Sequence, residues 1–223
     1  MNSVIIPASG VGKRFGAELP KQFASLKGQD ILWHTIKIFE DSPAIGEIAV
    51  TVPPGFKDRV ASYGFAKVRH IIDGGETRAA SVNLALKALD PSTRVVLVHD
   101  GVRPFVTEDI IAKVIAGAEK NQAVITGLPV TDTIKVVYPA GRVARTVDRR
   151  HMWQIQTPQG FTYDILTKAY AQAEKTNSAL QTATDDASLV EQLGQSVHII
   201  EGSKKNIKIT TPEDFEIAEQ FMN

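Results

Sequence analysis

The chain contains no cysteine among its 223 residues. This absence excludes disulfide bonds, zinc–thiolate centres and cysteine nucleophiles, because each of them requires a thiol. No apolar run approaches the roughly 20 residues that a membrane-spanning helix needs. The N-terminus also lacks the basic start and apolar segment of a secretory signal. We therefore expect a cytoplasmic protein that does not act at a membrane.

An excess of charge of either sign is also missing. Lysine and arginine together number 25, as do aspartate and glutamate, so the formal net charge is zero. A neutral chain has no whole-molecule attraction for nucleic acid, and any anion-binding site must be local. Hydrophobic residues make up 43% and charged residues 22% of the chain, as in soluble globular proteins. The length suits one domain, which we expect to span residues 1–223.

Short apolar segments alternate with helical patterns along the chain. Strands are predicted at Ser3–Pro7, Glu47–Val52, Val68–Ile72, Val95–Val98, Ala123–Leu128, Val197–Glu201 and Ile207–Thr210. Helices are predicted at Ile31–Glu40, Arg78–Leu89, Glu108–Asn121, Tyr163–Lys175, Asp186–Leu193 and Pro212–Met222. This order predicts an α/β fold with a doubly wound, mostly parallel sheet of Rossmann-like type. In such sheets ligands bind beyond the carboxyl ends of the strands.

One segment departs from the alternation. Residues 131–149 read as two short strands around the turn Pro139-Ala140-Gly141, which predicts a protruding β-hairpin arm over residues 131–150. An isolated hairpin is only marginally stable in water. We therefore expect the arm to lie against its own domain or against a second subunit.

The most informative loop covers residues 7–23, directly after the apolar run Val4-Ile5-Ile6. A strand that ends in a glycine-rich loop directs backbone N–H groups at a ligand and can cradle phosphates. This loop also carries Lys13, Arg14 and Lys21, cations that can stabilise charge developing during phosphoryl chemistry. The plainer alternative is an ordinary turn with surface cations.

Two common glycine-loop motifs do not fit this loop. The dinucleotide motif needs the spacing G-x-G-x-x-G, but Gly10 and Gly12 are followed by Gly16, one place late. The next predicted strand also lacks a terminal acid. A P-loop needs serine or threonine after its Gly-Lys, and here Arg14 follows Lys13. A dinucleotide-dependent oxidoreductase and a P-loop NTPase are therefore disfavoured.

The loops after the third and fourth predicted strands hold further candidates. Gly74-Gly75 is a second place where backbone can approach a ligand closely, or a simple turn into the next helix. Asp100 follows a buried strand, where a carboxylate can hold a metal or a sugar hydroxyl. Arg103 can grip a phosphate, or the two residues form an ion pair that only ties the loop. His99 is either a buried histidine with satisfied hydrogen bonds or a residue that takes part in the chemistry, and the sequence favours neither.

Two more cations lie later in the chain. Arg149 is either a candidate phosphate clamp or part of a solvated basic edge. Lys208 alternates with apolar neighbours, so its side chain either points into a polar cleft or snorkels to the surface. Thr184 can line a site or cap a helix. The cations together indicate substrates with several phosphates. Because an attacking phosphate is already ionised near neutral pH, positioning and electrostatic stabilisation suffice without a general base.

Nine short motifs are spread along nearly the whole chain: Pro7-Ala8-Ser9-Gly10-x-Gly12-x-Arg14, Pro20-Lys21-Gln22, Asp73-Gly74-Gly75 with Arg78 and Ser81, His99-Asp100-x-x-Arg103-Pro104, Asp132-Thr133-x-Lys135, Thr146-Val147-Asp148-Arg149, Thr157-Pro158-Gln159, Thr184-Asp185-Asp186 and Asn206-Ile207-Lys208-x-Thr210-x-Pro212-Glu213-Asp214. Together they resemble the 2-C-methyl-D-erythritol 4-phosphate cytidylyltransferase family.

The resemblance implies a reaction in which the 4-phosphate of methylerythritol phosphate attacks the α-phosphate of CTP and pyrophosphate leaves. It implies Mg²⁺ held mainly by the CTP phosphates, with no metal ligand assigned to the protein. It also implies a homodimer joined by the arm over residues 131–150. These expectations belong to the family and are carried here onto the matching positions.

The resemblance also implies roles for individual residues. The catalytic set is Arg14, Lys21, Arg149 and Lys208, with Arg149 reaching across from the partner subunit. The CTP-binding set is Pro7, Ala8, Ser9, Gly10, Gly12, Gly75, Glu76, Arg78, Ser81 and Asp100. The set for the polyol phosphate is Asp100, Arg103, Thr133, Arg149, Thr157, Thr184 and Lys208. The chain departs from the family pattern at Ser9, Glu76 and Gly101-Val102, and the last pair bears on how the polyol is held.

Two rival functions remain open at this point. A pentitol-phosphate cytidylyltransferase acting on ribitol phosphate would share the CTP site and differ at the polyol pocket. A non-catalytic nucleotide-sensing module would keep the glycine loop without needing the cations. Turnover with each polyol phosphate separates the first rival, and the cations argue against the second.

Overall fold

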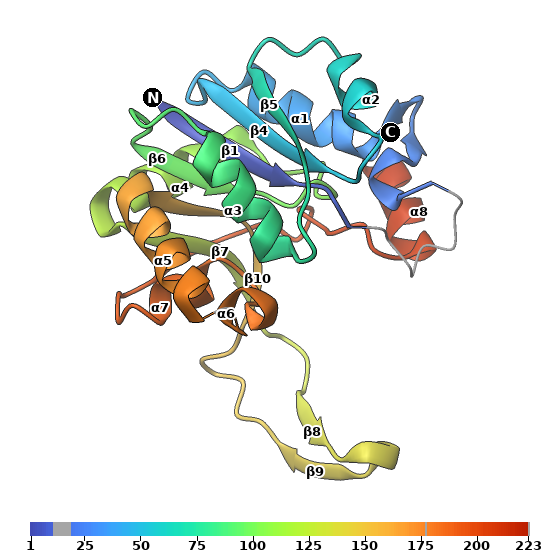
Figure 1. The fold of residues 1–223 in the computed structure, drawn as a ribbon. Helices are drawn as coiled ribbons and strands as arrows, with labels where there is room; N and C mark the ends of the chain where they lie inside the picture. Colours follow the sequence, from blue (N-terminus) through green and yellow to red (C-terminus); the bar gives the residue numbers. More distant parts are fainter. Residues whose placement is uncertain (11–18, 177, 223) are drawn as a thin grey trace.

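The computed structural model describes residues 1–10, 19–176 and 178–222, and Figure 1 shows their arrangement. Seven of the described strands form one sheet in the order β11-β7-β10-β6-β1-β4-β5. Their bounds are β1 (Asn2–Pro7), β4 (Glu47–Val52), β5 (Val68–Asp73), β6 (Val95–Val98), β7 (Ala123–Pro129), β10 (Trp153–Thr162) and β11 (His198–Glu201). All run parallel except β10, which pairs antiparallel with both β6 and β7. The predicted α/β fold with a mostly parallel sheet is confirmed.

Helices cover both faces of the sheet. One face carries α1 (Ile31–Asp41), α2 (Lys57–Ala61) and α4 (Glu108–Asn121). The other carries α3 (Arg78–Ala88), α5 (Tyr163–Thr176), α6 (Ser178–Thr182) and α7 (Ala187–Glu191). The last helix, α8 (Pro212–Phe221), packs beside the small ribbon of β2 (Ser25–Leu26) and β3 (Gln29–Asp30).

The continuous apolar runs of the central strands follow from this two-sided burial. In β1, Val4 and Ile6 join the apolar cluster under α1 and α4, whereas Ile5 joins the cluster under α3 and α5. All three side chains are fully buried. Burial of an aliphatic side chain is worth about 1.5–3 kcal/mol, so the central strands anchor the loops that follow them.

The helix starts follow the expected capping chemistry. The Thr107 hydroxyl accepts the N–H of Ile110 at the start of α4. Thr211 and Asp214 form a reciprocal capping box at the start of α8, where Pro212 occupies the first helical turn. These caps satisfy backbone N–H groups that have no partner inside the helix.

One strand prediction was wrong, and one long strand of the sheet was not predicted. Residues 207–210 form no strand, although Ile209 donates its N–H to the Val102 carbonyl at 2.9 Å. This segment crosses the carboxyl ends of the strands without joining the sheet. The ten-residue strand β10 was missed, because Pro158, Gly160 and the polar residues around them obscure its apolar pattern. Its ladder with β7 is interrupted between Gln156 and Gln159.

The predicted hairpin is present. Strands β8 (Lys135–Val137) and β9 (Val143–Thr146) pair antiparallel around the short 3₁₀ turn η2 (Pro139–Gly141). Every residue of both strands is exposed, and the hairpin extends away from the rest of the chain in Figure 1. In the part of the chain that the structure describes, no helix has the length and apolarity to cross a membrane.

Candidate active site

Two adjoining cavities lie where the loops after β1, β5 and β6 meet at the carboxyl edge of the sheet. Their volumes are about 460 Å³ and about 250 Å³. Arg78, Asp100 and Lys208 line both cavities, so these three side chains form a shared wall. We call the larger space the first cavity and the smaller one the second cavity.

The first cavity lies between the loops that follow β1 and β5. Residues 7–10 line one side and residues 74–76 line the other. The hydroxyls of Ser9 and Ser81 lie 2.8 Å apart, and the Ser81 hydroxyl accepts the N–H of Gly75 at 3.0 Å. Ser81 is fully buried on α3, and it therefore ties the two loops together.

Gln22 supports the loop after β1 from the short 3₁₀ helix η1 (Lys21–Phe23). Its buried amide nitrogen donates to the carbonyl oxygens of Ala8 at 2.5 Å and Gly10 at 3.1 Å. Lys21, the preceding residue, lines the first cavity. The same segment therefore fixes the loop and supplies a cation to the cavity.

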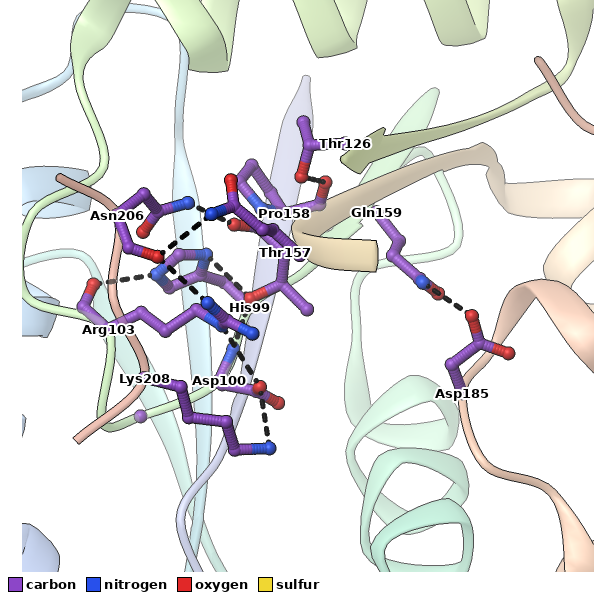
Figure 2. Close-up of polar contacts among 12 residues, drawn as sticks. His99, Asp100, Arg103, Thr126, Thr157, Pro158, Gln159, Asp185, Asn206 and Lys208 are labelled. Atoms are coloured by element: carbon purple, nitrogen blue, oxygen red, sulfur yellow. Dashed lines mark hydrogen bonds and ion pairs between the residues drawn. The ribbon is translucent and has the colours of Figure 1, made fainter. Parts of the chain in front are cut away.

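The second cavity lies between β10, the loop before α7 and the loop after β6. Gln159 donates to the Asp185 carboxylate at 2.8 Å, and its side-chain oxygen accepts the N–H groups of Asp186 and Ala187 at 3.2 and 3.1 Å. This amide joins β10 to the start of α7 (Figure 2). Thr184 and Asp185 thereby line the cavity from the helix side.

Asp100 is the charged centre of the shared wall. Its Oδ2 lies 3.0 Å from Lys208 Nζ and 3.3 Å from Arg103 Nε, as Figure 2 shows. Its Oδ1 lies 3.3 Å from Arg78 Nε. Asp100 and Arg103 are buried, whereas the Lys208 side chain is 42% exposed. Lys208 is thus the partner that an arriving anion reaches most easily.

The surrounding cations keep this carboxylate ionised. Burial by itself would raise the pKa of the Asp100 carboxyl, but Arg78, Lys208 and Arg103 outweigh burial and hold the pKa well below its usual range. Burial lowers the pKa of the Arg103 guanidinium, and Asp100 opposes that change. The shared wall therefore stays a fixed array of charges at neutral pH.

A buried chain of contacts holds Arg78 in this array. Its Nη1 lies 2.7 Å from Asp186 Oδ2, and the Tyr170 hydroxyl donates to Asp186 Oδ1 at 2.5 Å. Asp186 is fully buried, and Tyr170 is almost so. Burial and the nearby Asp186 carboxylate raise the pKa of the Tyr170 phenol well above its ordinary value.

His99 is fully buried next to Asp100 at the end of β6. Its Nε2 lies 3.0 Å from the Arg103 carbonyl oxygen and its Nδ1 lies 3.2 Å from Thr157 Oγ1 (Figure 2). The same Thr157 oxygen accepts the backbone N–H of Asp100 at 3.0 Å. Burial lowers the pKa of the imidazole to about 4. His99 is therefore a buried, hydrogen-bonded residue, and its ring contacts Thr157 and Arg103, which line the second cavity.

Gly101 and Val102, where the chain departs from its expected pattern, line the first cavity and not the second, and they also serve packing. A Cβ on Gly101 would lie 2.9 Å from the Ala8 side chain and 3.1 Å from Leu32. Val102 is buried in the cluster that α8 covers, together with Ile209. The small residue at position 101 therefore allows the loops after β1 and β6 to approach one another.

Most of the predicted site residues gather around the two cavities. Those lining the first cavity are Pro7, Ala8, Ser9, Gly10, Lys21, Gly75, Glu76, Arg78, Asp100 and Lys208. Those lining the second are Arg78, Asp100, Arg103, Thr157, Thr184 and Lys208. Ser81 lies behind the wall of the first cavity. Gly12 and Arg14 fall outside the described residues.

Thr133 and Arg149 do not join the others within this chain. Both are exposed and belong to the arm, and neither lines a described cavity.

Several polar residues of the site were not among the sequence predictions. Gln156 donates to the carbonyls of Ser203 and Asn206 at 2.9 and 3.3 Å, and Asn206 donates to the Thr157 carbonyl at 2.7 Å. These bonds hold the segment that carries Lys208. Prediction of β10 as a strand would have placed Gln156 near the carboxyl edge of the sheet. Its partners Ser203 and Asn206 lie far along the chain, so no local pattern predicts these contacts.

The chain is similar along its whole length to a known enzyme family. A family model described as 2-C-methyl-D-erythritol 4-phosphate cytidylyltransferase matches residues 2–223. The protein of that name from Alkaliphilus oremlandii is 45% identical, with 99% of this chain and 94% of the relative covered. The one from Clostridioides difficile is 44% identical, with 100% of this chain and 94% of the relative covered.

Solved structures of the same family have the same fold. The 2-C-methyl-D-erythritol 4-phosphate cytidylyltransferase of Francisella tularensis superposes with a TM-score of 0.86 at 35% identity, covering 99% of both chains. The 4-diphosphocytidyl-2C-methyl-D-erythritol synthase of Anaerococcus prevotii gives a TM-score of 0.84 at 32% identity, covering 100% of this chain and 96% of that one.

Proposed function

The chain belongs to the 2-C-methyl-D-erythritol 4-phosphate cytidylyltransferase family, which joins CTP and methylerythritol phosphate to give 4-diphosphocytidyl-2-C-methyl-D-erythritol and pyrophosphate, and we propose that the two adjoining cavities carry out this transfer. The observation that supports the proposal is the shared wall of Arg78, Asp100 and Lys208. A transfer between two bound molecules needs two spaces that meet where the new bond forms.

The first cavity suits the nucleotide. Its backbone-lined walls, residues 7–10 and 74–76, allow a flat base and a ribose to approach closely. Lys21 lines the same cavity, and Arg14 lies outside the described residues. We assign both cations to the α-phosphate of CTP, where negative charge accumulates as the bond to pyrophosphate lengthens.

The second cavity suits the polyol phosphate. The Asp100 carboxylate can accept hydrogen bonds from polyol hydroxyls, and Arg103, Thr157 and Thr184 line the surrounding wall. Lys208, the most exposed partner of Asp100, can turn from the carboxylate to the arriving phosphate. A phosphate oxygen of the polyol then attacks the α-phosphorus, and the P–O bond to pyrophosphate breaks. No proton needs to be removed from the attacking oxygen, because it is already ionised.

The family uses a divalent cation, and we propose Mg²⁺ held mainly by the triphosphate. Glu76 and Asp100 are the carboxylates that line the first cavity, and Asp100 is already engaged by three cations. Within residues 1–10, 19–176 and 178–222 no cluster of three or more potential metal ligands occurs. This sparse donor set fits an ion coordinated chiefly by phosphate oxygens. When bound, the ion neutralises charge on the triphosphate and favours departure of pyrophosphate.

We further propose that residues 1–223 form one domain and that the arm over residues 131–150 joins two copies. Its exposed Val137 (56%), Val143 (54%) and Tyr138 (51%) give it an apolar surface, of which the Arg142 guanidinium covers part by lying over the Tyr138 ring. Exposed apolar patches of this kind mark interaction sites. A partner's arm would bring Thr133 and Arg149 to the second cavity. Both substrates are charged phosphate esters that cross membranes poorly, so we propose a cytoplasmic location.

Pyrophosphate release with purified protein tests the assignment of Lys208. Lys208→Ala should lower kcat/KM for methylerythritol phosphate by about 10²-fold, as expected for a lost charged contact in the transition state. Lys205→Ala is the matched control, since Lys205 is exposed on the same segment and lines neither cavity. Equal effects of the two substitutions would contradict the assignment.

The same assay separates the polyol substrates. Methylerythritol phosphate and ribitol phosphate should be offered in parallel with CTP at equal concentrations. We expect turnover with methylerythritol phosphate. Turnover with ribitol phosphate alone would assign the second cavity to a pentitol.

A further inference from the structure

The turn that carries the polyol-facing residues is held at both ends by one buried imidazole. Asp100 and Arg103 lie at the start and end of this turn, and the Arg103 N–H donates to the Asp100 carbonyl at 3.1 Å. The two ring nitrogens of His99 each contact one end of the turn. Nε2 bonds the Arg103 carbonyl directly, and Nδ1 bonds the Thr157 hydroxyl, which in turn accepts the Asp100 N–H.

The direction of each hydrogen bond follows from donor and acceptor chemistry. A carbonyl oxygen can only accept, so the Arg103 carbonyl requires the proton on His99 Nε2. Thr157 Oγ1 already accepts the Asp100 N–H, which leaves its own hydrogen available. With Nε2 protonated in a neutral ring, Nδ1 is an acceptor, and the Thr157 hydroxyl donates to it at 3.2 Å. The bonds therefore run in one direction from Asp100 to the Arg103 carbonyl.

We propose that His99, protonated on Nε2, is a positioning residue for the polyol-phosphate cavity, acting through the Thr157 hydroxyl on Asp100 and through the Arg103 carbonyl on Arg103. It touches neither substrate. The inference rests on the proposed function of Asp100 and Arg103 in binding the polyol phosphate.

Burial supports this role. His99 is 0% and Thr157 is 6% exposed, so water does not replace a lost partner. A buried imidazole with a low pKa stays neutral at physiological pH and keeps Nδ1 as an acceptor. A doubly protonated ring would present a second donor to Thr157 Oγ1 and reverse the direction of the hydroxyl.

The competing role is packing alone. The imidazole lies against Phe39 with ring centroids 5.0 Å apart, so its loss disturbs the core as well as the hydrogen bonds. His99→Phe keeps an aromatic ring and removes both nitrogens. His99→Asn keeps an acceptor where Nδ1 stands. Phe39→Leu disturbs the same packing and leaves the hydrogen bonds in place.

Steady-state kinetics on the full-length enzyme distinguishes the two roles. His99→Phe should raise the KM for methylerythritol phosphate about tenfold, since a buried hydroxyl and carbonyl lose their partners, and should change the KM for CTP by about twofold at most. His99→Asn should recover part of the loss in the polyol KM, because Thr157 regains its acceptor while the Arg103 carbonyl still lacks its donor. Phe39→Leu should leave the ratio of the two KM values unchanged.

A tautomer measurement supplies a readout that kinetics do not. Long-range ¹H–¹⁵N NMR of the wild-type protein should show an Nε2-protonated ring, assigned by its loss in His99→Asn among the five histidines. Thr157→Val should shift the Nδ1 resonance of this ring. An Nδ1-protonated tautomer overturns the proposal even if His99→Phe fails to fold.

Asp100→Asn separates failure of this inference from failure of the proposed function. One outcome is that Asp100→Asn raises the polyol KM, while His99→Phe either raises the KM values for both substrates in parallel or changes neither. His99 then has no positioning role, and the assignment of Asp100 stands. If Asp100→Asn leaves the polyol KM unchanged, both the assignment of Asp100 and the inference are overturned.

Discussion

At the scale of single residues, three cations of the candidate site, Arg78, Arg103 and Lys208, are held against the buried carboxylate of Asp100. The alternation of Lys208 with Ile207 and Ile209 left either a polar cleft or the surface open to its side chain, and the side chain lines both cavities while it remains 42% exposed. The alternation was informative although the segment is not a strand, since an extended chain also turns successive side chains to opposite sides.

Lys21 allows a test of charge stabilisation in the transition state. Lys21→Ala should lower kcat by about 10²-fold with a small change in the KM for CTP, because the charge it stabilises grows mainly in the transition state. The measurement is steady-state pyrophosphate release at saturating polyol phosphate. Lys37→Ala, which removes an exposed lysine paired with Asp41 on α1, should leave kcat unchanged. A rise in the KM for CTP with an unchanged kcat would make Lys21 a ground-state contact.

His99 makes stability depend on pH. Burial lowers its pKa from 6.5 to about 4; the hydrogen bond to the Arg103 carbonyl and the Asp100 charge oppose this decrease, and the charges of Arg103 and Arg78 add to it. Between these values the unfolded chain binds a proton that the folded chain excludes, so the free energy of unfolding falls as the pH falls. The expected loss from this group between about pH 7 and about pH 5 is about 2 kcal/mol.

Urea unfolding of wild type and His99→Asn at both pH values checks this expectation. Other titrating groups are common to the two proteins, so the difference between their pH dependences reports His99. Parallel curves would mean that the imidazole keeps its ordinary pKa in the folded protein.

At the scale of elements, the first cavity depends on how closely two loops approach. A Cβ on Gly74 would collide with the Ser9 side chain and lie 3.0 Å from Ser81 Oγ. Gly74→Ala should therefore push the loop after β1 outwards and raise the KM for CTP about tenfold or more, since overpacking at a tight contact displaces backbone. The double variant Ser9→Gly, Gly74→Ala removes the collision and should recover part of the affinity. A double variant no better than Gly74→Ala would show that the loops do not share this contact.

The elements also show what a sequence pattern can predict. Strands buried on both faces, such as Val95–Val98, and helices with strong caps, such as Glu108–Asn121, were predicted at nearly their observed bounds. β10 was missed because a strand that contains Pro158 and Gly160 has little local preference for its structure, and pairing with β6 and β7 decides it instead. The short helices α2 and α6 were missed for lack of length.

The candidate site was predictable in its residue types and loops, and much less so in its contacts. Residues 7–10, Asp100, Arg103 and Lys208 follow strands or carry charge, and they line the two cavities as the sequence predicts. The Arg78–Asp186 ion pair joins residues that are far apart in the chain, and no local pattern pairs them. The same holds for Gln159 and Asp185, whose contact depends on the bulge in β10.

At the scale of the whole molecule, the proposal that the arm over residues 131–150 joins two copies can be tested. Replacing residues 131–150 by a short flexible linker should give monomers in sedimentation experiments, because the exposed apolar surface of β8 and β9 is then lost. Val137→Glu is a milder variant, since Val137 is exposed and its substitution leaves the core of each copy unaltered. The charge should weaken the same association.

Activity should fall with association in both variants if a partner's arm completes the second cavity. Far-UV circular dichroism controls for folding. A stable dimer after removal of the arm would move the interface to another surface.

The wall common to the two cavities has a consequence for how the reactants bind. If the arriving phosphate draws Lys208 away from Asp100, as proposed, the charge presented to the neighbouring cavity changes, and occupancy of one cavity would alter the affinity of the other. Thermodynamic linkage makes such an effect mutual: if the nucleotide tightens or loosens the hold on the alcohol, the alcohol changes the hold on the nucleotide by the same factor. A double set of titrations, each with and without the second ligand, would give that factor directly.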